Sequence, residues 1–142
     1  MINENFKVTG QVTIQKNGEV VRDIPNTVVT AGKNNIAALI TDAGSKMTHM
    51  AVGTGTTAVA AGDTTLETET DRNALSVSGG SPSTNTVVHT AVWAAGDGTG
   101  ALTEAGLFSA SSGGTMMART VFSAVNKGAS DVLTITWTLT IS

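Results

Sequence analysis

The segment 132–142 reads VLTITWTLTIS and alternates apolar with polar side chains from Leu133 to its end. Successive side chains of a β-strand point to opposite faces of the sheet, so this segment predicts a strand with one face in a core and the other lined by threonine. The residues predicted to face the core are Leu133, Ile135, Trp137, Leu139 and Ile141. A chain that ends in such a strand needs a second layer to cover its apolar face.

The front of the chain predicts a β-hairpin over residues 6–24. Val8, Val12 and Ile14 share one face of its first strand. The strand runs into Asn17-Gly18, the pair of residues that best tolerates the positive φ angles of a two-residue hairpin turn.

A change of period after residue 30 predicts one short α-helix near residues 31–42. Ile36, Leu39 and Ile40 have helical spacing in TAGKNNIAALITDAG. Thr30 is the expected N-cap and Gly44 the expected stop, because threonine suits the first position of a helix and glycine the position after its end.

The remaining chain predicts short strands separated by glycine-rich breakers, about eight strands in all. Threonine and valine are abundant, with 16 glycines and only 2 prolines. These features predict a mainly β protein, a single-domain antiparallel β-sandwich over 1–142 with jelly-roll-like character and the one inserted helix. Residues 1–5 are expected to form an N-terminal arm.

Composition narrows the classes of function. Charged residues make up 13% of the chain, the net charge is −3, and the basic residues are scattered singly. This argues against nucleic-acid binding, which needs clustered phosphate contacts. No apolar run is long enough to span a membrane, and the first residues lack the pattern of a secretory signal. So low a proportion of charged residues predicts that part of the surface is covered by a partner.

The stretch 51–72, AVGTGTTAVAAGDTTLETETDR, is the best candidate for a loop with chemistry. It lacks the Lys-Ser/Thr pair and the following helix that a phosphate-binding loop requires. Its acidic residues do not follow the spacing of an EF-hand, so a solvated acidic edge is favoured and calcium binding stays an open alternative. The oxygen ligands for that alternative would be Asp63, Glu67, Glu69 and Asp71, and Asp97 in AAGDGTG could lie in a similar loop.

No arrangement typical of catalysis is evident, and no cofactor or metal is expected. His49 and His89, the only histidines, lie within predicted strands without a partner motif. Glu104 is an isolated acid between apolar residues, and we expect it to form a structural ion pair with Arg72 or Arg119.

Four residues are candidates for an interface with a partner. They are the apolar or aromatic residues of the N-terminal segment and one tryptophan, which is assigned either to the core or to an interface: Met1, Ile2, Phe6 and Trp93.

Three segments together resemble a pattern found in small virion proteins of tailed bacteriophages. They are NTVVTAGKNNIAALI, MAVGTGTTAVAAGDTTLETETDR and EAGLFSASSGGTMMARTVFSAVNKGASDVLTITWTLTIS. The shared features are a hairpin, a helix, an AVGTGTT loop that leads to Leu, an acid and Arg, an E-x-GLF strand and a closing L-x-I-x-W strand. The resemblance spans nearly the whole chain after residue 5.

The resemblance implies a non-enzymatic structural protein of the particle exterior. The first expectation is a capsid decoration (cement) protein that binds the major capsid protein, associates with itself as a homotrimer, and is made in the host cytoplasm before it joins the virion. A tail fibre, collar or baseplate component, with a receptor- or glycan-binding role, is the alternative. A small hydrolase, which the resemblance does not imply, is the third hypothesis. No nucleic-acid or membrane partner is expected.

Overall fold

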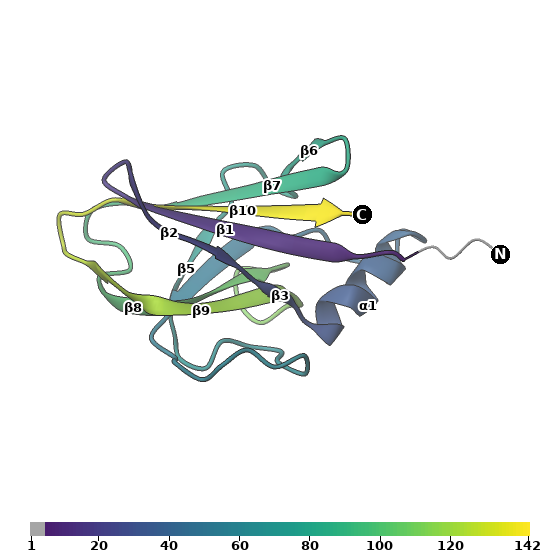
Figure 1. The fold of residues 1–142 in the computed structure, drawn as a ribbon, viewed down its shortest axis with the longest axis horizontal. Helices are drawn as coiled ribbons and strands as arrows, with labels where there is room; N and C mark the ends of the chain where they lie inside the picture. Colours follow the sequence, from purple (N-terminus) through teal and green to yellow (C-terminus); the bar gives the residue numbers. More distant parts are fainter. Residues whose placement is uncertain (1–4) are drawn as a thin grey trace.

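The terminal strand lies at the centre of a five-stranded antiparallel sheet. In the computed structural model, which describes residues 5–142, β10 (Leu133–Ile141) pairs with β1 (Val8–Lys16) on one side and with β7 (Thr86–Trp93) on the other. β2 (Glu19–Pro25) and β6 (Ser81–Ser83) form its edges (Figure 1). The first and last strands of the fold are therefore direct neighbours.

The alternation predicted for this strand is confirmed. Leu133, Ile135, Trp137 and Leu139 are buried. Ile141, predicted to face the core, is instead 38% exposed because it is the last residue of its strand, at the end of the sheet. On the outer face, threonines stand side by side across neighbouring strands, as Thr13, Thr136 and Thr90 do.

A second antiparallel sheet faces the first and completes a β-sandwich. Its order is β3 (Thr27–Val28), β9 (Met116–Lys127), β8 (Gly100–Phe108), β4 (His49–Gly53) and β5 (Glu69–Ala74). One apolar cluster, drawn from both sheets, fills the space between them. The predicted mainly β sandwich with one short helix is confirmed.

The predicted hairpin is also confirmed, with its turn at the expected residues. Asn17 and Gly18 have φ angles of 53° and 83°. Positive φ at both central positions matches the twist of the flanking strands, β1 and β2.

The one helix within residues 5–142, α1 (Thr30–Leu39), begins and ends earlier than predicted. Thr30 is its first helical residue rather than its N-cap, and the cap position is held by Val29, whose backbone is extended and which makes no side-chain cap bond. The main-chain N–H of Thr30 instead donates to the carbonyl of Ala61 at 2.8 Å. A partner from a distant loop thus replaces the local cap.

Gly44 is not the residue that ends α1. The left-handed conformation after the helix is taken by Asp42, with φ 60°. Gly44 is needed for space, since a side chain there would collide with main-chain atoms of Asn35 and Leu39. Asn35 then fixes the following turn by hydrogen bonds to both main-chain groups of Ser45.

Trp93 belongs to the core and not to an interface. Its side chain is fully buried in the same cluster as Trp137. The reason is the phase of β7, which places Ala91 and Trp93 on the inner face and leaves Val92 exposed.

Side-chain and loop contacts close both seams between the sheets. On one side, the guanidinium of Arg22 on β2 donates to the carbonyls of Ser123 and Ala124 on β9, at 3.0 and 2.8 Å. On the other, Asn73 Nδ2 donates to the carbonyl of Val92 at 2.9 Å. The open edges of the strands are thereby partly satisfied within the molecule.

Candidate functional site

The loop of residues 54–68, called here the 54–68 loop, covers the outer face of the second sheet (Figure 1). Beneath it lies a small apolar cluster in which Leu66 is buried together with Ala51, Phe108 and Met116. The outer face of this sheet is therefore a second core, built from loop and strand. It positions the loop that the sequence singled out.

The segment EAGLF of β8 is organised so that alternate residues serve the two cores. Ala105 and Leu107 belong to the central cluster, whereas Phe108 belongs to the cluster beneath the loop. Gly106 leaves room for Leu66, because a side chain at this glycine would press on the Leu66 methyl group and the Phe108 ring. Glu104 begins the segment at the base of the loop.

The carboxylate of Glu104 holds both ends of the 54–68 loop. Its Oε1 accepts main-chain N–H groups from Gly55 at 3.0 Å and Thr68 at 2.7 Å, and its Oε2 accepts the N–H of Glu67 at 3.0 Å. The residue has no exposed surface. Gly53 and Gly55 permit this approach, since a side chain at either would meet the carboxylate.

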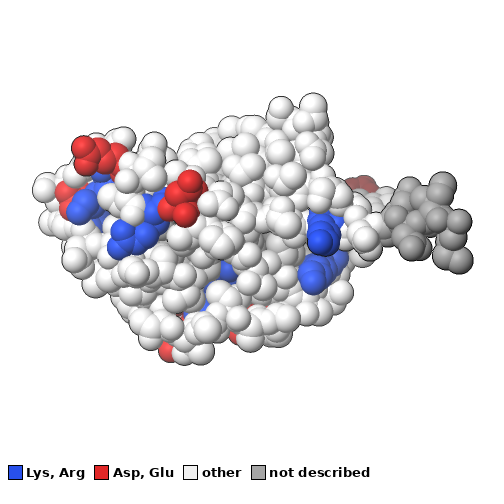
Figure 2. Space-filling model, viewed as in Figure 1, with Lys and Arg blue, Asp and Glu red and all other residues white. Residues whose placement is uncertain are grey.

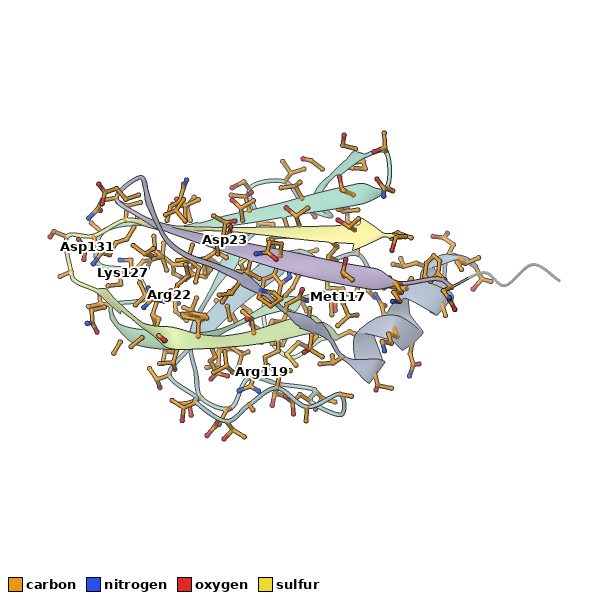
Figure 3. All side chains as sticks on the ribbon, in the orientation of Figure 1. Arg22, Asp23, Met117, Arg119, Lys127 and Asp131 are labelled. Carbon is orange, nitrogen blue, oxygen red and sulfur yellow. The ribbon has the colours of Figure 1, made fainter. Side chains whose placement is uncertain are left out.

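Arg119 on β9 neutralises the buried carboxylate. Its Nε and one terminal nitrogen lie 3.1 and 2.9 Å from Glu104 Oε2, and its other terminal nitrogen lies 3.0 Å from Asp63 Oδ2. Glu67 is farther away, at 3.9 Å. Figure 3 shows Arg119 extending from β9 toward the loop. The charge-assisted bonds join the strands to both halves of the loop.

A β-bulge aims Arg119 at this site. Phe108 pairs with Met116 and Leu107 pairs with Ala118, so Met117 is an extra residue in β9. Met117 and Ala118 consequently both join the central core, and Arg119 faces outward.

The surroundings keep Glu67 ionised. Hydrogen bonds from the side chain and the main-chain N–H of Thr57 hold the pKa of Glu67 below its usual value, and Arg119 lowers this pKa further. The N–H of Thr57 lies 2.7 Å from Glu67 Oε2. Glu67, the third acid near Arg119, thus links Thr57 in the first half of the loop to the last residues of the loop.

Arg72 and Arg119 are the two predicted partners of Glu104. Arg72 does not pair with it. It stacks on the Phe108 ring at 3.8 Å from the centroid and pairs with Glu69 at 2.7 Å. It also donates to the carbonyls of Ala110 and Gly113, each at 2.9 Å. Its place on β5, at the edge of the sheet, puts it over the β8–β9 turn instead of beneath the loop.

Of the other predicted interface residues, Phe6 is strongly exposed, whereas Met1 and Ile2 lie outside the described residues. His89 is buried on β7, and His49 contacts the hydroxyl of Thr48 at 2.8 Å. Within residues 5–142 no three His, Asp or Glu side chains are grouped as a metal site would require. No helix in this range is long and apolar enough to cross a membrane.

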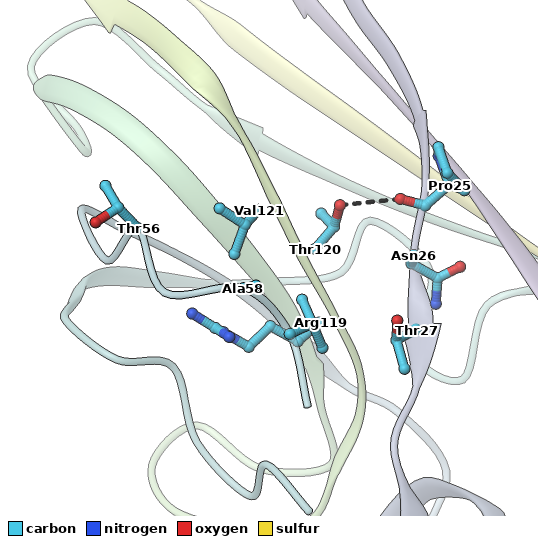
Figure 4. A pocket seen from close by; sticks show the side chains of 9 residues that line it. Pro25, Asn26, Thr27, Thr56, Ala58, Arg119, Thr120 and Val121 are labelled. Atoms are coloured by element: carbon cyan, nitrogen blue, oxygen red, sulfur yellow. Dashed lines mark hydrogen bonds between the residues drawn. The ribbon is translucent and has the colours of Figure 1, made fainter. Parts of the chain in front are cut away.

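Shallow hollows of about 350 and 410 Å³ flank Arg119. The first lies between the loop and the chain that links β2 to β3, and its lining includes Thr56, Ala58 and Asn26 (Figure 4). The hydroxyl of Thr120 closes its base by donating to the carbonyl of Pro25 at 3.0 Å. The arrangement presents small uncharged side chains around a rigid, buried ion pair.

Comparison of the chain with protein-family models, with curated proteins and with solved structures finds no match.

Proposed function

We propose that this protein is a non-enzymatic structural component of the exterior of a bacteriophage particle, and that it acts as a capsid decoration protein. The observation that carries the proposal is the anchoring of the 54–68 loop by Glu104 and Arg119. The AVGTGTT loop and the E-x-GLF strand, two segments behind the resemblance to phage virion proteins, meet in this one unit. Its buried charges are used to fix a loop in place.

The exposed part of the loop suits contact with another protein surface. Thr56, Thr57, Ala58 and Ala60 are exposed, small and uncharged. A pre-ordered loop loses little conformational entropy when it binds, so a modest contact repeated over many copies is sufficient. Binding to the assembled shell and not to its free subunits would stabilise the shell by mass action.

The distribution of charge supports the same proposal. Five of the eight basic residues donate to acceptors within the fold, and two of the five, Arg119 and Lys127, are buried. The five are Lys16, Arg22, Arg72, Arg119 and Lys127. Figure 2 shows charged side chains gathered toward the two ends of the view, with a broad region between them that carries few. Depletion of charge is typical of the central part of protein interfaces.

The test is co-sedimentation of the purified protein with undecorated capsid shells. Because the chain has no cysteine, Ala58→Cys and Val20→Cys each introduce one site for a polyethylene glycol maleimide. Val20 is an exposed control on β2, far along the chain from the loop. We expect the unlabelled protein and labelled Val20→Cys to sediment with shells, and labelled Ala58→Cys to remain in solution.

Failure of the unlabelled protein to bind shells would overturn the decoration role. A trimer that ignores shells would then favour the tail-fibre, collar or baseplate alternative. The homotrimer itself stays a prediction, for which light scattering coupled to size exclusion is the measurement.

A further inference from the structure

Helix α1 and its C-cap residue carry apolar side chains that the described chain leaves exposed. Ala37 and Ile40 lie on this face, and Ile40 is 84% exposed. Ile36 beside them is half-buried and joins the face to the central core. A groove of about 380 Å³ runs beside them and is also lined by Phe6, itself 69% exposed. Large apolar side chains clustered at this exposure mark a contact surface.

The charges around α1 are placed against its own dipole. Lys33 lies in the first turn, where the N-terminal end of a helix favours an acid, and Asp42 follows the last turn, where the C-terminal end favours a base. Both side chains are exposed, and neither forms a salt bridge with any residue in the described range. Basic side chains do lie at the α1 end of the molecule (Figure 2).

An antiparallel copy of the same helix reverses this mismatch. It would bring Lys33 of each copy to the negative, C-terminal end of the other copy's helix, beside Asp42 of that copy. Ala37, the small residue near the middle, allows close approach, and Ile40 would enter the groove of the other copy. The surface is thus complementary to itself in apolar shape and in charge, as a twofold interface requires.

We propose that two copies of this protein associate through α1, with the helices packed antiparallel about a twofold axis. A helix of ten residues is about 15 Å long, so the contact is small and its affinity belongs to the weak range of specific interfaces. The association is therefore concentration-dependent in solution. It does not depend on the proposed function, because shells are not needed for it to form.

Charge reversal gives the test, measured by sedimentation velocity over a range of protein concentrations. Lys33→Glu places an acid opposite the partner's Asp42, and Asp42→Lys places a base opposite the partner's Lys33. We expect each variant alone to raise the dissociation constant at least tenfold. Each change also improves the match to the helix dipole, so thermal unfolding is expected to show a folded protein in both cases.

Mixing the two variants is the decisive measurement. In the mixed pair, the acid introduced in one copy faces the base introduced in the other, and the unchanged Asp42 of the first copy faces the unchanged Lys33 of the second. Association is therefore expected to return to the level of the unchanged protein. An association state that neither variant alters would overturn the proposal, as would a loss that mixing does not restore. If a trimer forms through another surface, two trimers would associate through α1. The variants are then expected to prevent this pairing of trimers and to leave each trimer intact.

Discussion

At the scale of single residues, Glu104 is a fully buried carboxylate held by several partners. Removing a carboxylate from water is costly unless its charge and its lone pairs are satisfied. Here three main-chain N–H groups and one guanidinium provide that compensation. What the arrangement supplies is a unique position for the 54–68 loop, since any displacement would leave a buried charge unpaired.

Glu104→Gln is expected to lower the free energy of unfolding by about 3–5 kcal/mol, because it leaves the Arg119 charge buried without its closest partner. Urea denaturation followed by tryptophan fluorescence measures this change. Glu19→Gln, at an exposed position of β2, is the matched control and is expected to change stability by less than about 0.5 kcal/mol. Equal stability of the two variants would contradict the anchoring role.

His89 is expected to make stability depend on pH in the range just below 6.5. Burial lowers the pKa of His89 below its usual value of 6.5, an effect only partly offset by the main chain of Trp137. The unfolded chain then binds more protons than the folded one in this window, so the free energy of unfolding falls as pH falls through it. Lys46 lines the same apolar hollow as His89.

Urea denaturation between about pH 7.5 and pH 5 measures this slope, and His89→Gln is expected to flatten it. The lowered pKa values of Glu67 and Asp131 act in a separate window, because those groups lose stabilising charge only as pH falls below their usual values of 4.5 and 3.8. An unchanged slope in His89→Gln would show that another group is responsible.

At the scale of elements, the ends of strands and the seams between sheets carry the specific chemistry. β3 covers β9 only at Ala118 and Arg119, so the rest of that edge would be open to pairing with another chain. Arg22 occupies it by reaching across from β2 to two carbonyls. A charged side chain at an edge is a known protection against unwanted strand pairing.

Arg22→Ala is expected to lower the free energy of unfolding by about 1–2 kcal/mol, because two carbonyls lose charged donors. It is also expected to increase light scattering on prolonged incubation, since the edge of β9 becomes available for pairing. Lys7→Ala is the control, an exposed base whose contacts in the fold are made by its main chain. Arg22→Ala scattering no more than the control would exclude edge protection.

At the scale of the whole molecule, one core joins segments from both ends of the chain. Val12 and Ile14 of the first strand pack in the same cluster as Trp137 of the last. The main chain reinforces this closure, because Lys7 and Ser142 exchange hydrogen bonds of 2.7 and 2.9 Å. The sheet that contains β1, β10 and β7 cannot form until β10, the last strand, is available.

Unfolding is therefore expected to be a single transition, with the same midpoint by tryptophan fluorescence and by far-ultraviolet circular dichroism. Refolding is expected on a time scale of roughly milliseconds to seconds, because the pairing of β1 with β10 closes a loop of nearly the whole chain. Stopped-flow fluorescence measures the rate. Two separated equilibrium transitions would show that the sheets fold independently.

Much of the fold could be predicted because its signals are local. The period of two in 132–142 identified the last strand and its buried face, and Asn17-Gly18 identified the first turn. The ends of α1 were predicted less well. A long-range hydrogen bond from the N–H of Thr30 to the carbonyl of Ala61 took the place of a side-chain cap. No residue near Thr30 in the sequence indicates such a partner.

The β-sandwich follows from the order of the amino acids, since alternation and turn preferences depend on adjacent residues alone. Three outcomes needed the folded chain: Arg119 meets Glu104, Arg72 meets Glu69, and Trp93 is buried. They depend on strand register, on the phase of each strand and on the extra residue Met117 in β9. Register is set by contacts between distant segments, so a one-residue bulge redirects side chains that the local pattern cannot place.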